Sequence, residues 1–145
     1  MREEPLYLED VQEGQELPQF VRVTDLMNWN RYAAVNDEFV YIHMDEEAGK
    51  AAGMKGVFGM GNVRYAYLHN MVRDWIGLHG EIRKLGIQYR GINYKNDKLT
   101  CKGRVTKKYL EDKQHLVDLD LLVENQAGEN IAPGTATVVL PTRSR

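Results

Sequence analysis

The strongest helical pattern of apolar positions lies in the middle of the chain, in "GNVRYAYLHNMVRDWIG" (61–77). Its apolar residues recur every three or four positions, which predicts a long, largely buried helix. The same spacing predicts an earlier helix over 25–35, with Thr24 as its N-cap. Asp45 is placed to cap a brief helix that Gly53 ends. The apolar side of the long helix consists of Val63, Ala66, Tyr67, Met71, Trp75 and Ile76.

After Gly80 the period of the apolar positions changes to two. Alternation of this kind predicts antiparallel strands with one buried face, and a short strand is also expected near Phe20. One curved antiparallel sheet wrapped around the long helix accounts for this order. The sequence therefore predicts an α+β fold in a single domain over residues 1–145. The alternating segments are "IRKLGIQYRG", "KLTCKGRVTKKYL", "QHLVDLDLLVEN" and "IAPGTATVVLP".

Composition narrows the class of protein. The 145 residues include 19 basic and 21 acidic ones spread along the chain without a long basic run, so we do not expect nucleic acid as a partner. Cys101 is the only cysteine, which excludes an internal disulfide and a cysteine-built metal site. The histidines lack metal-ligand spacing, so we expect no metal site. Without a signal core or an apolar run of membrane-spanning length, a cytoplasmic protein with no membrane partner is expected.

Two neighbouring carboxylates precede a histidine in "NDEFVYIHM" (36–44). Histidine is suited to proton transfer near pH 7, and a carboxylate can orient it or share its work. Glu38 and His43 are therefore candidates for an acid/base pair, with Asp37 as an alternative carboxylate. The spacing also allows a loop histidine that hydrogen-bonds the backbone while both carboxylates are solvated.

The segment "MKGVFGMGN" (54–62) brings glycines to the start of the long helix. Gly59 and Gly61 permit close approach of a ligand to the backbone. The first turn of a helix presents unpaired N–H groups and a positive dipole end, which suit a thioester carbonyl that becomes an enolate. The segment matches neither a dinucleotide-binding motif nor a P-loop. A glycine turn that only packs the helix against the sheet is the alternative.

The stretch "RYAAVNDEFVYIHMDEEAGKAAGMKGVFGMG" resembles the hydratase signature of the MaoC-like dehydratases, which include the (R)-specific enoyl-CoA hydratases. "INYKNDKLTCKGRVT" resembles that family's strand pair, and the similarity covers about residues 25–139. The resemblance implies a hot-dog fold, in which an antiparallel sheet wraps around one long helix. It also implies a hydro-lyase that needs no metal or redox cofactor and acts on acyl chains carried on coenzyme A or acyl carrier protein. The resemblance further implies a dimer or a larger oligomer.

The resemblance assigns roles to individual positions. The family's catalytic aspartate falls on Glu38 and its catalytic histidine on His43. This pair would activate a water that adds to C3 of a trans-2-enoyl thioester, or run the reverse dehydration. The glycine whose backbone N–H polarises the thioester carbonyl falls on Gly61. The positions expected to bind substrate are Gly61, Val40, Met60 and Gly59.

Three positions depart from the family's pattern, which has aspartate at Glu38, asparagine at Val40 and commonly histidine at Met60. Glutamate keeps the charge but is one methylene longer, and Val40 lacks a side-chain amide. Two further functions stay open for this reason. One is a non-catalytic hot-dog subunit or acyl-thioester binding module of a hetero-oligomeric dehydratase. The other is a hot-dog acyl-CoA thioesterase, in which Glu38 or Asp37 activates water against the carbonyl.

Overall fold

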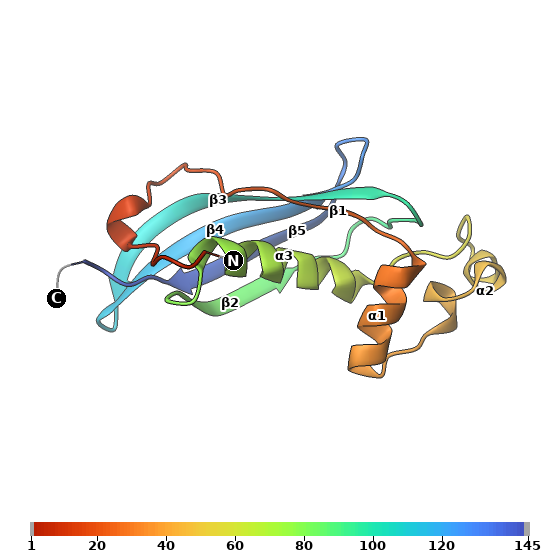
Figure 1. The fold of residues 1–145 in the computed structure, drawn as a ribbon. Coiled ribbons are helices and arrows are strands. Elements are labelled where there is room, and N and C mark those ends of the chain that lie inside the picture. Colours follow the sequence, from red (N-terminus) through yellow and green to blue (C-terminus); the bar gives the residue numbers. More distant parts are fainter. Residues whose placement is uncertain (1, 144–145) are drawn as a thin grey trace.

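The structure, a computed structural model, describes residues 2–143 and contains the elements that the pattern predicts (Figure 1). Five strands form one antiparallel sheet in the order β1-β3-β4-β5-β2. The predicted α+β class is confirmed. In chain order, the elements are the 3-10 helix η1 (Leu8–Asp10), β1 (Phe20–Val23), α1 (Leu26–Asn36), the 3-10 helix η2 (Tyr41–His43), α2 (Glu46–Ala51), α3 (Gly61–Ile76), β2 (Glu81–Ile87), β3 (Lys98–Glu111), β4 (Gln114–Glu124) and β5 (Asn130–Val139).

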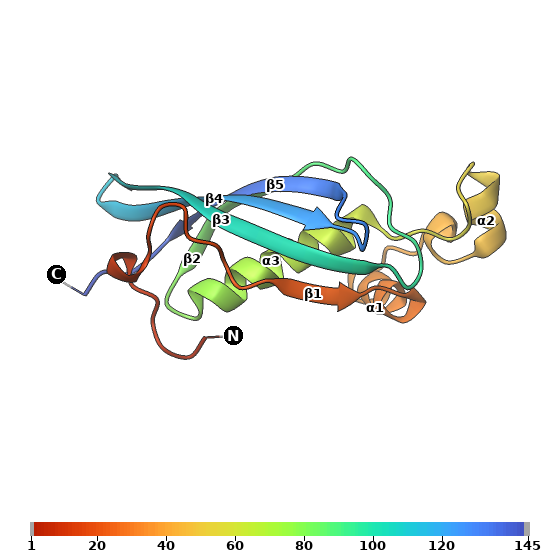
Figure 2. The same cartoon turned by 90° about the horizontal axis from the view of Figure 1, so that it is seen from above.

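The sheet curls around α3, the longest helix (Figures 1 and 2). Irregular register interrupts the β2–β5 ladder between Ile82 and Lys84, and the β3–β4 ladder between Val105 and Lys107. Bulges of this kind bend a strand and increase its twist, which allows a sheet to wrap a helix. The sheet and helix therefore have the hot-dog arrangement.

The side of α3 that the spacing identified faces the sheet. Five of the six predicted residues are buried, and Ala66 is half-buried. On the sheet, Val105 of β3 lies opposite Leu119 of β4, and each is only 1% exposed. Full burial of a large apolar side chain contributes about 1.5–3 kcal/mol, so α3 is held chiefly by apolar contacts. The five buried residues are Val63, Tyr67, Met71, Trp75 and Ile76.

The predicted N-cap of the first helix is wrong by one residue. Asp25 caps α1, because its Oδ1 accepts a hydrogen bond from the Asn28 N–H at 2.9 Å. Thr24 is fully buried, and its hydroxyl accepts a hydrogen bond from Trp29 Nε1 at 2.6 Å. A buried indole N–H needs an acceptor, and Thr24 supplies it. The Asp45 cap of α2 is confirmed, with Asp45 Oδ1 2.8 Å from the Ala48 nitrogen.

Residues 26–51, which we call the helical extension, lie beyond one end of the sheet (Figures 1 and 2). They contain α1, η2 and α2, and they stand next to the N-terminal end of α3 in both views. The two candidate segments of the sequence, one in the helical extension and one at the start of α3, are therefore brought to the same end of the molecule.

Cys101 lies in the core on β3, with 1% of its surface exposed. Burial raises the pKa of its thiol to about 12, so the thiol is protonated at neutral pH. We expect iodoacetamide at pH 8 to leave the native protein unlabelled and to label it fully in guanidinium chloride, as measured by intact mass. Labelling of the native protein at the rate of an exposed cysteine would contradict this burial.

Candidate active site

The segment 54–60, between α2 and α3, is anchored to the helical extension by Glu46. The Glu46 carboxylate accepts hydrogen bonds from the Val57 N–H at 2.9 Å and from Lys95 Nζ at 2.5 Å. The hydrogen bond from Lys95 and then that from Val57 hold the pKa of this carboxyl below its usual value. Glu46 is therefore an ionised anchor that fixes the backbone leading to α3.

Gly59 is packed too closely for any other residue. Its N–H donates to the Asn93 carbonyl at 2.8 Å, and a Cβ at this position would lie 2.3 Å from Asn93 Nδ2. The adjacent Phe58 pairs with Tyr94 in an isolated β-bridge. Because the Gly59 N–H is already used, Gly59 has no backbone donor for a substrate. For its predicted role in substrate binding, Gly59 can therefore contribute only space for a ligand close to its backbone.

Gly61 is the first residue of α3, and its N–H donates to no other described residue. Met60 is the N-cap by position but makes no side-chain cap, and its side chain is 3% exposed in the core. The ring of Tyr89 lies against Gly61, since a Cβ there would be 3.0 Å from three ring atoms. The Tyr89 hydroxyl donates to Asn62 Oδ1 at 2.8 Å. Gly61 therefore offers a free N–H at the positive end of a long helix, beside an aromatic wall.

His43 ends η2 and is joined to the segment before Gly61. Its Nδ1 lies 2.8 Å from the Phe58 carbonyl oxygen, and its ring contacts the Phe58 ring edge-on at 4.9 Å. A carbonyl can only accept, so Nδ1 carries the proton and Nε2 keeps a lone pair. His43 therefore hydrogen-bonds the backbone, which is what the alternative interpretation of the sequence, a structural loop histidine, also predicted. The bond nevertheless leaves Nε2 able to accept a proton.

Asp37 and Glu38 are placed differently by the end of α1. Asp37 has φ 51° and is the exposed C-cap residue of that helix. The next N–H, that of Glu38, also donates to the Ala33 carbonyl, at 3.0 Å. This left-handed end turns the chain sharply, and Glu38 is half-buried as a result. Of the two carboxylates, Glu38 is the better candidate for the site.

The charge of Glu38 reaches the aromatic wall beside Gly61. Burial raises the pKa of both Tyr32 and Tyr89, and the nearby Glu38 carboxylate adds to each rise. Within residues 2–143, no hydrogen bond or ion pair joins Glu38 directly to His43. A hydrogen bond thus joins His43 to the segment before α3, whereas Glu38 affects the Tyr89 ring beside Gly61 only through its charge.

Val40, the remaining predicted position in this loop, is 41% exposed. Its neighbours Phe39 and Tyr41 are 62% and 82% exposed. Three successive apolar side chains on the surface form an apolar patch beside the candidate pair. Such a patch is typical of a surface that a ligand or a partner covers.

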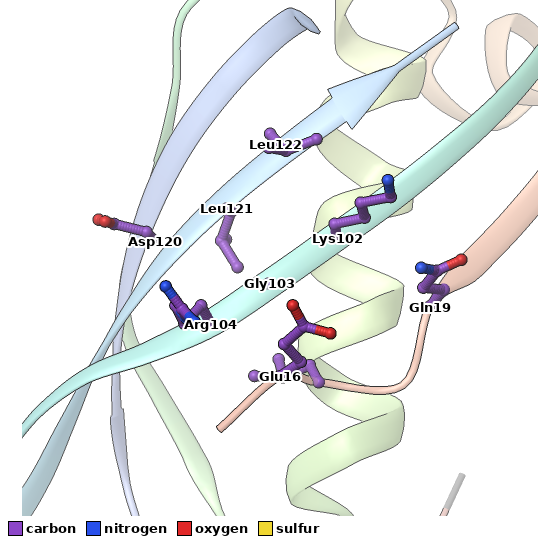
Figure 3. A pocket seen from close by; sticks show the side chains of 9 residues that line it. Glu16, Gln19, Lys102, Gly103, Arg104, Asp120, Leu121 and Leu122 are labelled. Carbon is purple, nitrogen blue, oxygen red and sulfur yellow. The ribbon is translucent and has the colours of Figure 1, made fainter. Parts of the chain in front are cut away.

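Two depressions differ in their relation to these residues. A pocket of about 420 Å³ lies over the seam of residues 16–19 with β3 and β4, where Figure 3 shows α3 behind the sheet. Its lining includes Lys102, Arg104 and Asp120 and none of the predicted site residues. A groove of about 430 Å³ runs between α1 and α3 and is bordered by Tyr32 and Val63. The lining of the groove also contains none of the predicted site residues, but it includes Asn36 and Val63, each two positions along the chain from Glu38 or Gly61.

Sequence reasoning missed Tyr89, Asn93 and Arg64. Tyr89 stood in an alternating segment but lies in the turn after β2, and nothing local indicates that it meets Gly61. Arg64 carried a signal, because helical spacing puts it on one side of α3 with Leu68 and three other buried residues. Those four are Leu68, Met71, Val72 and Trp75.

The described part of the chain has neither a helix suited in length and apolarity to crossing a membrane nor a group of three or more His, Cys, Asp or Glu side chains able to hold a metal ion. No model of a protein family matches the sequence. No curated protein matches it either.

Solved structures do match, over nearly the whole chain. The (R)-hydratase PhaJ1 from Pseudomonas aeruginosa has a TM-score of 0.84 at 18% identity, covering 93% of this chain and 85% of that one. A MaoC-like dehydratase from Rhodospirillum rubrum has a TM-score of 0.81 at 20% identity, covering 97% and 99%. A chain of the ChsH1-ChsH2 complex from Mycobacterium tuberculosis has a TM-score of 0.78 at 22% identity, covering 89% and 98%. At this level of identity the likeness concerns the fold, and the chain has the hot-dog fold of the MaoC-like dehydratases and (R)-hydratases.

Proposed function

We propose that this protein is an acyl-thioester hydratase/dehydratase that adds water to a trans-2-enoyl thioester or removes it from a 3-hydroxyacyl thioester. In this proposal Glu38 orients the reacting water, His43 accepts a proton from it, and Gly61 N–H polarises the thioester carbonyl. The carrier is coenzyme A or acyl carrier protein, and no metal or redox cofactor takes part. The observation that carries the proposal is the hydrogen bond of His43 Nδ1 to the Phe58 carbonyl.

That bond fixes which nitrogen can act. With Nδ1–H donated to Phe58, Nε2 of His43 accepts a proton from a water oriented by the Glu38 carboxylate. The water oxygen bonds to C3 while the C2–C3 double-bond electrons move toward C1 and the thioester oxygen becomes negative. Gly61 N–H and the positive end of α3 stabilise that oxygen. The proton held by His43 then goes to C2, which completes the addition.

Two features near the start of α3 support a thioester as the substrate. The groove between α1 and α3 has room for an acyl group and is lined by apolar Val63 and Ala66 as well as by polar side chains. The free N–H of Gly61 suits an oxygen that carries charge only during the reaction. The similarity of fold to a MaoC-like dehydratase and to PhaJ1 adds an analogy of architecture.

The direct test is hydration of crotonyl-CoA and of longer and branched enoyl-CoAs. We expect the absorbance of the conjugated thioester to fall, with formation of the 3-hydroxyacyl product and no free thiol. Release of thiol without hydration would instead identify a thioesterase. Absence of both reactions over a broad panel, also with acyl carrier protein as carrier, would refute the proposed activity.

The second candidate is a subunit or acyl-thioester binding module that needs another hot-dog chain for catalysis. The apolar patch of Phe39, Val40 and Tyr41 favours it, since a partner would cover these side chains. The likeness to a chain of the ChsH1-ChsH2 complex is consistent with it. Purification of an active homo-oligomer would reject this candidate. Activity that appears only after co-expression with a second hot-dog chain would favour it.

A further inference from the structure

Arg64 is a buried cation without an anionic partner. It lies in the first turn of α3 and is 4% exposed. Its Nη1 donates to the carbonyl of Gly91 and, at 3.4 Å, to that of Ile131. Its Nε has no partner, and no carboxylate of residues 2–143 forms an ion pair with it. The guanidinium is therefore bonded only to neutral backbone oxygens.

This position is unfavourable for a positive charge. Burial of an ion without a counter-ion is costly, and burial lowers the pKa of Arg64 for that reason. The N-terminal end of a helix carries a partial positive charge, so a cation in the first turn is repelled by it. Leu68 and Val72, one and two turns later on the same side, are apolar. Stability alone would favour an apolar residue at position 64 too.

Arg64 is connected to Gly61 through Tyr89. The guanidinium lies 5.3 Å from the centre of the Tyr89 ring, and the same ring covers Gly61. The carbonyl of Gly91, to which Arg64 donates, is two residues beyond Tyr89 in the same turn. Arg64 therefore holds the turn that carries the aromatic wall and keeps a positive charge beside that ring.

We propose that Arg64 is a positioning residue that holds Tyr89 across the first turn of α3 and supplies the positive charge met by the thioester oxygen as it becomes anionic at Gly61. The inference deepens the proposed hydratase function and rests on it. The neutral substrate gains little from this charge. When the water oxygen bonds to C3 and the double-bond electrons reach the thioester oxygen, the anion gains much more. The cost of the buried cation in the free protein is offset in that state.

The test compares Arg64→Gln, which removes the charge but keeps an amide donor, with Arg64→Lys, which keeps the charge. We expect Arg64→Gln to lower kcat about tenfold or more with KM changed less than about twofold, since the charge acts on the transition state. Arg64→Lys should retain most of the kcat that Arg64→Gln loses. The matched control is Arg73→Gln on the same helix, where Arg73 Nη1 donates to the Gly80 carbonyl at 3.1 Å. It should leave kcat unchanged.

A second readout does not depend on turnover. The Tyr89 phenol, which Tyr32, Tyr65 and Glu38 also face, should titrate at higher pH in Arg64→Gln. The phenolate absorbance difference from Tyr89→Phe in each background measures this. Wild-type kcat in Arg64→Gln, equal losses in the Gln and Lys variants, or an unchanged Tyr89 titration would overturn the inference and leave the hydratase proposal intact. A wild-type protein that hydrates no enoyl thioester overturns both.

Discussion

His43→Ala is expected to lower kcat for enoyl-thioester hydration by about 100- to 10,000-fold, the range that a positioned acid or base contributes. The reason is specific to one atom. Nδ1 is held by the Phe58 carbonyl, so Nε2 is the nitrogen available to take the proton from water. Alanine removes both nitrogens, and solvent water is a poor base at neutral pH. Initial rates at saturating crotonyl-CoA, measured across pH 6–9, would report the loss.

The controls separate proton transfer from structure. His79→Ala makes the same substitution at an exposed position and should leave the rate unchanged. Loss of the His43 hydrogen bond should cost only about 1 kcal/mol of unfolding free energy, so the His43 variant should remain folded at assay temperature. A folded His43→Ala protein with wild-type kcat would exclude His43 as the base and remove the central support of the proposed mechanism.

The fold could be predicted because its main signals are periodic. A three-to-four spacing marked α3, and a change to alternation marked β2 to β5. Such patterns reflect burial of one side of an element, which the sequence records directly. The Thr24 cap failed for a different kind of reason. Either Thr24 or Asp25 can cap a helix, and the choice depended on the buried indole of Trp29, which needed the Thr24 hydroxyl.

The candidate site was predictable only where its parts are close in sequence. Glu38 and His43 could be named from one loop and Gly61 from the glycines before a helix. The contacts around the start of α3 could not be predicted from the sequence. Tyr89 reaches Gly61 from the turn after β2, and Asn93 reaches Gly59 from the same turn. Those contacts depend on how the sheet curls around α3. The roles of all these residues in catalysis stay predictions, and so does a cytoplasmic location.

Glu38 stands where the family's pattern has aspartate, and the end of α1 determines where its longer side chain is placed. The left-handed residue Asp37 ends α1 and sets where the Glu38 side chain begins. The carboxylate then lies within electrostatic reach of Tyr89, which is hydrogen-bonded to Asn62 at the start of α3. Val40 supplies no amide in the loop, whereas Asn62, next to Gly61, accepts a hydrogen bond from the Tyr89 hydroxyl with its amide oxygen. The polar groups beside Gly61 thus come from α3 and from the turn after β2.

Gly61→Ala is expected to reduce kcat by about 100-fold with little change in stability. The added Cβ would lie beside the N–H that the thioester oxygen must approach and 3.0 Å from the Tyr89 ring. A displacement of the reacting group by about 1 Å lowers the rate about 100-fold, and loss of one oxyanion donor has an effect of at least that size. Alanine also favours a helix over glycine by up to about 1 kcal/mol, and the half-exposed Tyr89 ring can shift. Rates with crotonyl-CoA and urea unfolding curves measure the two effects.

The matched control is Gly86→Ala in β2, where an added Cβ meets nothing within 4 Å, and it should leave kcat unchanged. A double variant identifies which contact matters. If the displaced Tyr89 ring blocks the carbonyl, Gly61→Ala combined with Tyr89→Ala should be more active than the two single losses predict. If the Cβ itself blocks the carbonyl, the double variant should be no better than Gly61→Ala. Full activity of Gly61→Ala would show that neither the added Cβ nor a displaced Tyr89 ring obstructs the substrate, and it would contradict the close approach predicted at Gly61.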